Sequence, residues 1–208
     1  MGEFSGFPLE EKISQMWRSV PEDAEDKYAD NWLEAEYGSL TADLGFLAIL
    51  TWGPHPASRR RSVWDKVKSA YGEMGAPLHK LTSDQREKLV GCYPLRKGWQ
   101  GKFLRGMILH LGNSGLSMDE FAGKLKEAGP GVARAALQDV FGTSSSKVID
   151  SYLRDILLLD AFPIDAKVRR VLAKYNIPPD SYGIVAVCQR MEIPVRILAR
   201  AVQDMAVT

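Results

Sequence analysis

The stretch GTSSSKVIDSYLRDILLLDAFPIDAKVRRVL, residues 142–172, contains two helix starts separated by a proline. Serine is a preferred N-cap residue, and the serines at 144–146 precede an apolar periodic run that begins at Lys147. Pro163 prevents that helix from simply continuing. Asp165 then stands where it can cap a second helix, AKVRRVLAKYN. The stretch therefore predicts two consecutive helices, the first beginning with a lysine and the second with an aspartate.

The same helical punctuation extends along the rest of the chain. The stretch ADLGFLAILTW, residues 42–52, is apolar on nearly all sides and predicts a helix at the centre of the core. Further helix starts are marked by Pro8, Pro130 and Pro194, and by the capping-box pairs Thr82 with Gln85 and Ser117 with Glu120. No alternating strand pattern competes with this series. The sequence predicts an all-α fold, organised as a single unit over residues 1–208 or as two small lobes that share a core.

Charge is unevenly distributed along the chain, although the formal net charge is only +1. Residues 1–43 are acidic, whereas residues 58–68 and 96–105 are rich in arginine and lysine. A protein with a basic working face and an acidic remainder would give this near-zero total.

Composition also limits the cofactors and the compartment. The two cysteines, Cys92 and Cys188, cannot supply a disulfide framework, a four-thiolate zinc site or an iron–sulfur cluster, and both are expected to be buried thiols. The sequence shows neither a signal-peptide core nor an apolar run of membrane-spanning length. We therefore expect an intracellular protein (cytoplasmic, nucleoid or nuclear) that is a monomer and has no metal, other cofactor or membrane contact.

Taken locally, Lys147 is the more unusual of the two helix-start residues. An aspartate before a helix is ordinarily an N-cap. The first turn of a helix carries the positive end of its dipole and disfavours an ammonium group there. Helix position and burial would therefore both favour the neutral amine that a lysine nucleophile requires.

The stretch 130–172 resembles the helix–hairpin–helix DNA glycosylases, a superfamily that includes endonuclease III-like and 8-oxoguanine glycosylases. The segment FPIDAKVRRVL, Phe162 to Leu172, matches the family's turn and following helix nearly residue for residue. Asp165 follows Lys147 by 18 positions, which is the spacing of many bifunctional family members. The resemblance covers roughly residues 40–175 and is strongly specific only over 162–172.

The resemblance implies a two-lobed helical fold with a central cleft, in which the helix–hairpin–helix and catalytic segment occupies residues 130–175. It implies a base-excision-repair enzyme, acting on double-stranded DNA that contains a damaged base, with an associated AP lyase activity. Lys147 would form a Schiff base at C1′, and Asp165 would stabilise positive charge on the sugar. Oxidised purines such as 8-oxoguanine are the favoured substrates.

Other residues receive roles on the same basis. Trp52 and His55 occupy the loop that matches a base-pocket or wedge position. Contacts to DNA phosphates are expected from the hydroxyl and basic side chains of Ser144, Ser145, Ser146, Arg59, Arg60 and Lys97. Arg61, Arg96, Lys102, Arg169 and Arg170 are further basic candidates.

Two departures from the family pattern leave alternatives open. The family hairpin is rich in glycine, whereas this chain reads GTSSS at the matching place, which puts a metal-assisted phosphate grip in doubt. In a second alignment, AGPGVARAAL (128–137) would supply the hairpin and Ala135 would replace the lysine. The enzyme would then be monofunctional and use water with Asp165. A helical DNA-binding protein without catalytic activity is the third alternative.

Overall fold

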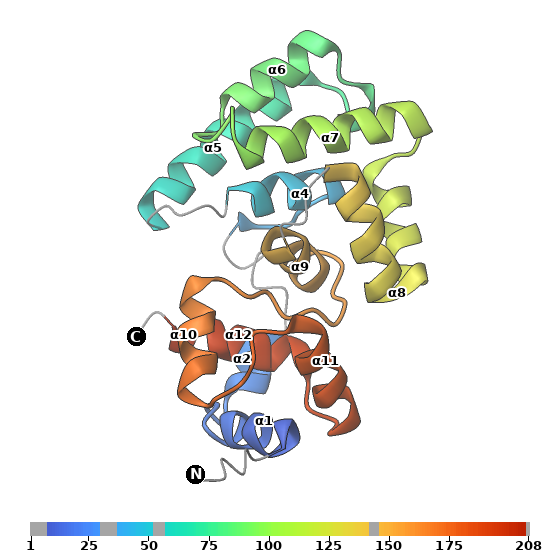
Figure 1. Ribbon diagram of the computed structural model, residues 1–208. Coiled ribbons are helices and arrows are strands. Elements are labelled where there is room, and N and C mark those ends of the chain that lie inside the picture. The colour runs from blue at the N-terminus through green and yellow to red at the C-terminus, as the bar shows by residue number, and fades with distance from the viewer. Residues whose placement is uncertain (1–7, 30–36, 52–56, 142–145, 207–208) are drawn as a thin grey trace.

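The computed structural model describes residues 8–29, 37–51, 57–141 and 146–206. Within these ranges every regular element is a helix, so the predicted all-α class is confirmed. The helices of residues 42–141 fill the upper half of Figure 1, and α9, Ser146–Asp155, lies between them and the remaining helices. None of these helices is long and apolar enough to cross a membrane.

The first core contains buried side chains from Tyr37 to Ala161. Its central helix is α4, Ala42–Leu50, in which every residue from Gly45 to Leu50 is buried, as the sequence predicts. Thr41 caps this helix by accepting a hydrogen bond from the N–H of Leu44. It packs against α5 Ala57–Met74, α7 Trp99–Ser114, α8 Met118–Phe141 and α9, whereas η1 Leu78–Lys80 and α6 Ser83–Gly91 pack against α7.

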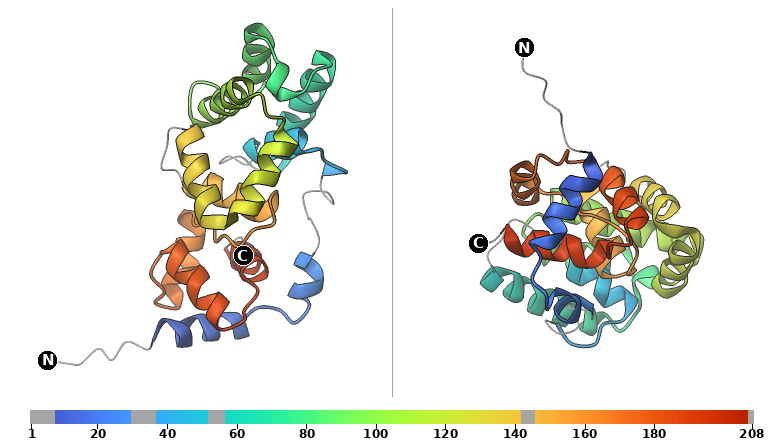
Figure 2. Two further views of the ribbon diagram at one scale, coloured as in Figure 1. Left: turned by 90° about the vertical axis from the view of Figure 1, so that its right-hand side faces the viewer. Right: turned by 90° about the horizontal axis from the view of Figure 1, so that it is seen from below.

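The second core is built from both ends of the chain. Buried Ile13 and Met16 of α1, Leu9–Arg18, pack with apolar side chains from the segment 162–202. Helix α1 lies against α11, Ser181–Arg190, and α2, Ala24–Ala29, lies against α12, Val195–Met205 (Figures 1 and 2). The helices of the C-terminal segment are α10 Ala166–Lys174, α11 Ser181–Arg190 and α12 Val195–Met205.

A sharp break divides α8 into two helical halves. Gly129 has a φ of 80°, a backbone conformation that favours glycine, and Pro130 follows as the first residue of the second half. The sequence marks Pro130 as a helix start, and the second half then runs to Phe141 beside α9. Residues 130–141 and α9 thus form the helical hairpin on which the site is built.

Helices α7 and α8 approach each other closely at Gly106. A Cβ atom at this position would lie only 2.5 Å from the carbonyl oxygen of Val140. Gly112, on the same helix, has room for a Cβ, because its nearest neighbour would be the His79 carbonyl oxygen at 3.7 Å. Only the first glycine is therefore required by the packing.

This contrast predicts opposite effects for the same substitution at two positions of α7. We expect Gly106→Ala to lower the free energy of unfolding by about 1–3 kcal/mol, because the backbone of α8 must shift. Gly112→Ala should instead raise it by about 1 kcal/mol, through helix propensity alone. Urea unfolding of both variants measures the difference, and equal stability of the two would contradict the close approach.

Candidate functional site

Lys147 and Asp165, the two predicted catalytic residues, lie together in the structure. The Nζ atom of Lys147 is 3.0 Å from Oδ2 of Asp165. Their side chains are 40% and 23% exposed, so the pair remains accessible to a substrate from solvent. Two helix starts that the sequence separates by Pro163 therefore bring an amine and a carboxylate into contact.

Asp165 also caps α10, as its sequence position predicts. Its Oδ1 atom accepts hydrogen bonds from the N–H groups of Lys167 and Val168, both at 2.9 Å. Burial alone would raise the pKa of Asp165, but these N–H groups and the Lys147 amine outweigh burial and lower it. The carboxylate is therefore anionic at neutral pH, with one oxygen directed to the helix and the other to Lys147.

Buried charges hold α9, the helix that carries Lys147, on two sides. Asp150 forms an ion pair with Arg134 of α8, and both side chains are at least 94% buried. Near the end of α9, Arg154 makes a bidentate pair with Asp155 and donates to Oε1 of Gln203 in α12 at 3.0 Å. These contacts hold α9 against the second half of α8 on one side and against α12 on the other.

The start of α10 rests on the same C-terminal helix. Phe162, Pro163 and Ile164 are buried just before Asp165, and α10 packs against α12. Because α12 supports both α9 and α10, the separation between Lys147 and Asp165 depends on this shared support. Arg134, Asp150 and Arg154 were not expected from the sequence as positioning residues. The available signal was the presence of charges on otherwise apolar helix faces.

Several predicted site residues fall outside the described residues. Trp52, His55, Ser144 and Ser145 lie there, and nothing places them relative to Lys147. Ser146 is the first residue of α9, and its side chain is likewise not described. Their predicted roles in the base pocket and in phosphate binding stay predictions.

The predicted basic residues are mostly exposed but come from separate elements. Arg59 and Arg60 belong to the first turn of α5, and Lys97 lies between α6 and α7. Arg59 and Lys97 are exposed, and Arg60 is half-buried. Arg61 pairs with Asp65 one turn further along α5, at 3.3 Å.

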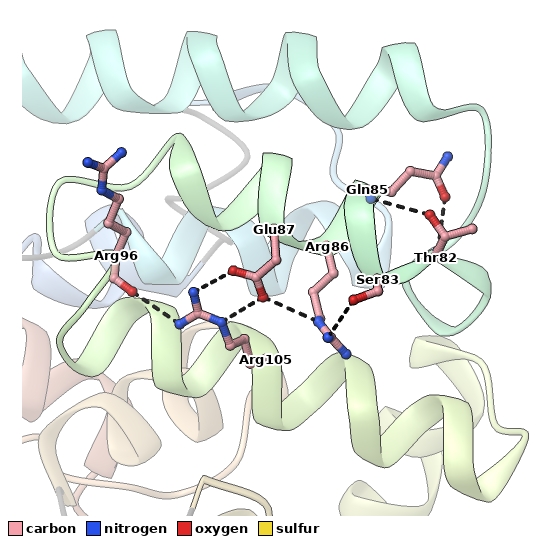
Figure 3. Close-up of polar contacts among 7 residues, drawn as sticks. All are labelled: Thr82, Ser83, Gln85, Arg86, Glu87, Arg96 and Arg105. Carbon is pink, nitrogen blue, oxygen red and sulfur yellow. Dashed lines mark hydrogen bonds and ion pairs between the residues drawn. The ribbon is translucent and has the colours of Figure 1, made fainter.

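Arg105, in the basic segment 96–105, stabilises the fold. Arg105 makes two hydrogen bonds to Glu87, of 2.8 and 2.6 Å, and one of 3.2 Å to the carbonyl oxygen of Arg96 (Figure 3). These bonds join α6, α7 and the loop between them. The Arg96 side chain points away from this cluster in Figure 3, and Lys97 and Lys102 are also exposed.

Arg169 and Arg170 of α10 lie one turn beyond Asp165. Both are exposed, and neither forms an ion pair with any residue in the described part of the chain. Their charges are therefore available to an external anion.

The cysteine expectation is correct for one residue and wrong for the other. Cys188 is fully buried in the second core, and burial raises the pKa of its thiol to about 12. Cys92 is only half-buried, because it follows the last residue of α6 at the edge of the first core. Across the described ranges, no three His, Cys, Asp or Glu side chains gather as potential metal ligands.

Two substitutions of Asp165 separate its cap from its charge. Asn is as good an N-cap as Asp, so Asp165→Asn should keep the helix start and lose only the ion pair with Lys147. Asp165→Ala should lose both and lower the free energy of unfolding by about 1 kcal/mol at pH 7.

The pH dependence follows from the lowered pKa of Asp165. A lowered native pKa contributes stability that is complete above the ordinary aspartate value of about 3.9 and is lost as the pH falls through the native value. The stability difference between the native protein and Asp165→Asn should therefore shrink below about pH 3.9. Urea titrations at pH 7, 5 and 3 would measure it, and a difference independent of pH would refute the ion pair.

A comparison of this chain with family models, with curated proteins and with solved structures finds no match in any of the three. The assignment of the site therefore depends on the geometry of Lys147 and Asp165 and on the chemistry that this geometry permits.

Proposed function

We propose that this chain is a DNA glycosylase with an associated AP lyase activity, built on the two-lobed helix–hairpin–helix glycosylase fold. The observation that carries the proposal is the 3.0 Å contact between the Lys147 amine and the Asp165 carboxylate. It joins the two residues that the resemblance assigns to catalysis. The competing alignment places Ala135 at the lysine position, within α8 and on its exposed side. An alanine there supplies no amine, so Asp165 would have to act with water as the nucleophile.

The proposed reaction begins with proton loss from the Lys147 ammonium, for which Asp165 is the adjacent acceptor. The neutral amine attacks C1′ of the damaged nucleotide, a C–N bond to the lysine forms, and the bond from C1′ to the base breaks. The base leaves with the electron pair of that bond and takes up the proton that Asp165 accepted from Lys147. The carboxylate, anionic again, stabilises the positive charge that develops on the sugar.

Strand cleavage follows from the same covalent intermediate. Opening of the sugar ring gives a protonated Schiff base between C1′ and Lys147. Loss of a proton from C2′ then expels the 3′ phosphate, and water hydrolyses the remaining imine and releases the lysine. Double-stranded DNA with an oxidised purine, 8-oxoguanine first, is the proposed substrate. Arg169 and Arg170 are exposed on the helix that Asp165 caps and suit contacts to phosphates.

Borohydride trapping on duplexes with one defined lesion tests the proposal. The panel consists of 8-oxoguanine, thymine glycol, uracil and an abasic site. We expect a covalent adduct with the native protein, and none with Lys147→Ala or Lys147→Arg, because only the primary amine forms a Schiff base. Lys147→Arg keeps a cation beside Asp165 and so controls for loss of the ion pair. Lys167→Ala, an exposed lysine next to the site, should trap normally.

The role of Asp165 is tested by the rate of base release. Asp165→Asn retains the helix cap but removes the negative charge, and we expect base release to slow by about 10²–10³-fold with little loss of stability. Base release without any trapped adduct would favour a monofunctional enzyme that uses water. Duplex binding with neither product nor lesion preference would favour a non-catalytic DNA-binding protein.

A further inference from the structure

A separate cavity of about 310 Å³ lies between the second half of α8, the end of α9 and α11. Leu153 of α9 lines it, six residues after Lys147, which corresponds to about 9 Å along the helix and about 120° around it. Neither Lys147 nor Asp165 contributes to its walls. The cavity is therefore distinct from the site described above. Its volume is at the lower end of the range for small-molecule pockets.

The walls of this cavity are mainly apolar. Leu153, Val185 and Ala186 contribute aliphatic surface from two helices. The ring of Tyr182 lies under the guanidinium of Arg134, whose central carbon is 4.6 Å from the ring centroid. Arg134 is itself held by its buried ion pair with Asp150, so the tyrosine meets a rigid partner. The arrangement favours a flat, mostly apolar ligand.

One edge of the cavity accepts hydrogen bonds. Nε2 of Gln189 donates to Oδ2 of Asp160 at 3.0 Å, which fixes both side chains. The second carboxylate oxygen of Asp160 and the amide oxygen of Gln189 have no partner among the described residues. Two acceptors therefore lie side by side along the lining, and a ligand with N–H donors on one edge would satisfy both.

The local charges disfavour an anion. Arg134 is neutralised by Asp150, and Asp160 adds an uncompensated negative charge to the lining. A phosphate or carboxylate group would meet Asp160, and no unpaired cation among the described lining residues would balance the two negative charges. A neutral ligand that donates hydrogen bonds suits this charge distribution.

We propose that the cavity binds a planar heteroaromatic ring of nucleobase size, with its N–H edge on Asp160 and Gln189. The ring lies between the aliphatic side chains of α9 and α11, and Tyr182 closes the mouth. Such a ring is available either as a free base or as an unstacked base of a nucleic-acid strand. The inference goes beyond the proposed glycosylase reaction and does not depend on it.

Equilibrium dialysis with free adenine, guanine, cytosine and uracil tests the proposal on the full chain. Saturable binding of at least one base is expected. Ala186→Phe, which fills the cavity from an exposed position on α11, should weaken binding at least about tenfold. Asp160→Ala should weaken it by about tenfold through loss of a charged acceptor. Ala173→Phe, at an exposed alanine of α10, is the matched control and should bind as the native protein does.

Three results would overturn the proposal: no saturable binding of any base, binding unchanged by Ala186→Phe, or equal affinity for indene, which has a similar flat shape but no N–H donor. A short single-stranded oligonucleotide distinguishes the two sources. If Ala186→Phe weakens its binding in parallel with that of the free base, the ligand is a base within a strand. If only free-base binding is weakened, the ligand is the free base. The assay involves no lesion and no bond cleavage, so a failure of the glycosylase proposal would leave its outcome interpretable.

Discussion

The structure depends on three buried charged side chains of α9, each of which needs an oppositely charged or hydrogen-bonding partner. Asp150, Arg154 and Asp155 are each at least 96% buried, in a helix of ten residues. A buried charge without a partner costs several kcal/mol, so each must meet an opposite charge or a hydrogen-bond partner in a fixed place. Asp150 pairs with Arg134 of α8, whereas Arg154 pairs with Asp155 and donates a hydrogen bond to Gln203 of α12. These requirements set the position of α9 relative to both cores.

A second arginine shares the Gln203 amide oxygen with Arg154. Nη1 of Arg200 donates to this oxygen at 3.1 Å, and Arg200 is 9% exposed. Burial, with repulsion from Arg154, lowers the pKa of Arg200 to about 10. One glutamine thus connects the helix of Lys147 with the helix that supports Asp165. Loss of the Gln203 contact would therefore displace the Lys147 amine and the Asp165 carboxylate relative to each other.

The features of the fold that could be predicted from sequence are those set by residues close together in the chain. The capping box at Thr82 and Gln85, the cap at Asp165 and the wholly apolar helix α4 follow from short-range rules, and all are present. Helix α2 was not expected, because six residues in an acidic segment carry no strong periodic signal. It is held instead by α12, where Lys27 and Tyr28 both donate to Asp204. Such distant contacts are not visible in local sequence.

The candidate site, like the fold, could be predicted from sequence only in part. Spacing and resemblance identified Lys147 and Asp165, which are in contact. The charges that position them could not be paired from sequence, because Arg134 and Asp150 are distant in the chain and ordinary in type. Basic clusters in sequence also proved a weak guide to free positive charge. Arg61 and Arg105 are used within the fold, whereas Arg169 and Arg170 remain unpaired within the described part of the chain.

The arrangement of the two cores has a consequence for synthesis on the ribosome. The first core uses a continuous segment of chain, from Tyr37 to Ala161, and can assemble as that segment emerges. The second core joins Ile13 and Met16 to residues that are synthesised much later, between Phe162 and Val202. The apolar face of α1 therefore stays exposed to solvent while some 140 further residues are synthesised. Throughout this interval the nascent chain exposes the hydrophobic face of α1, to which chaperones that recognise such segments can bind.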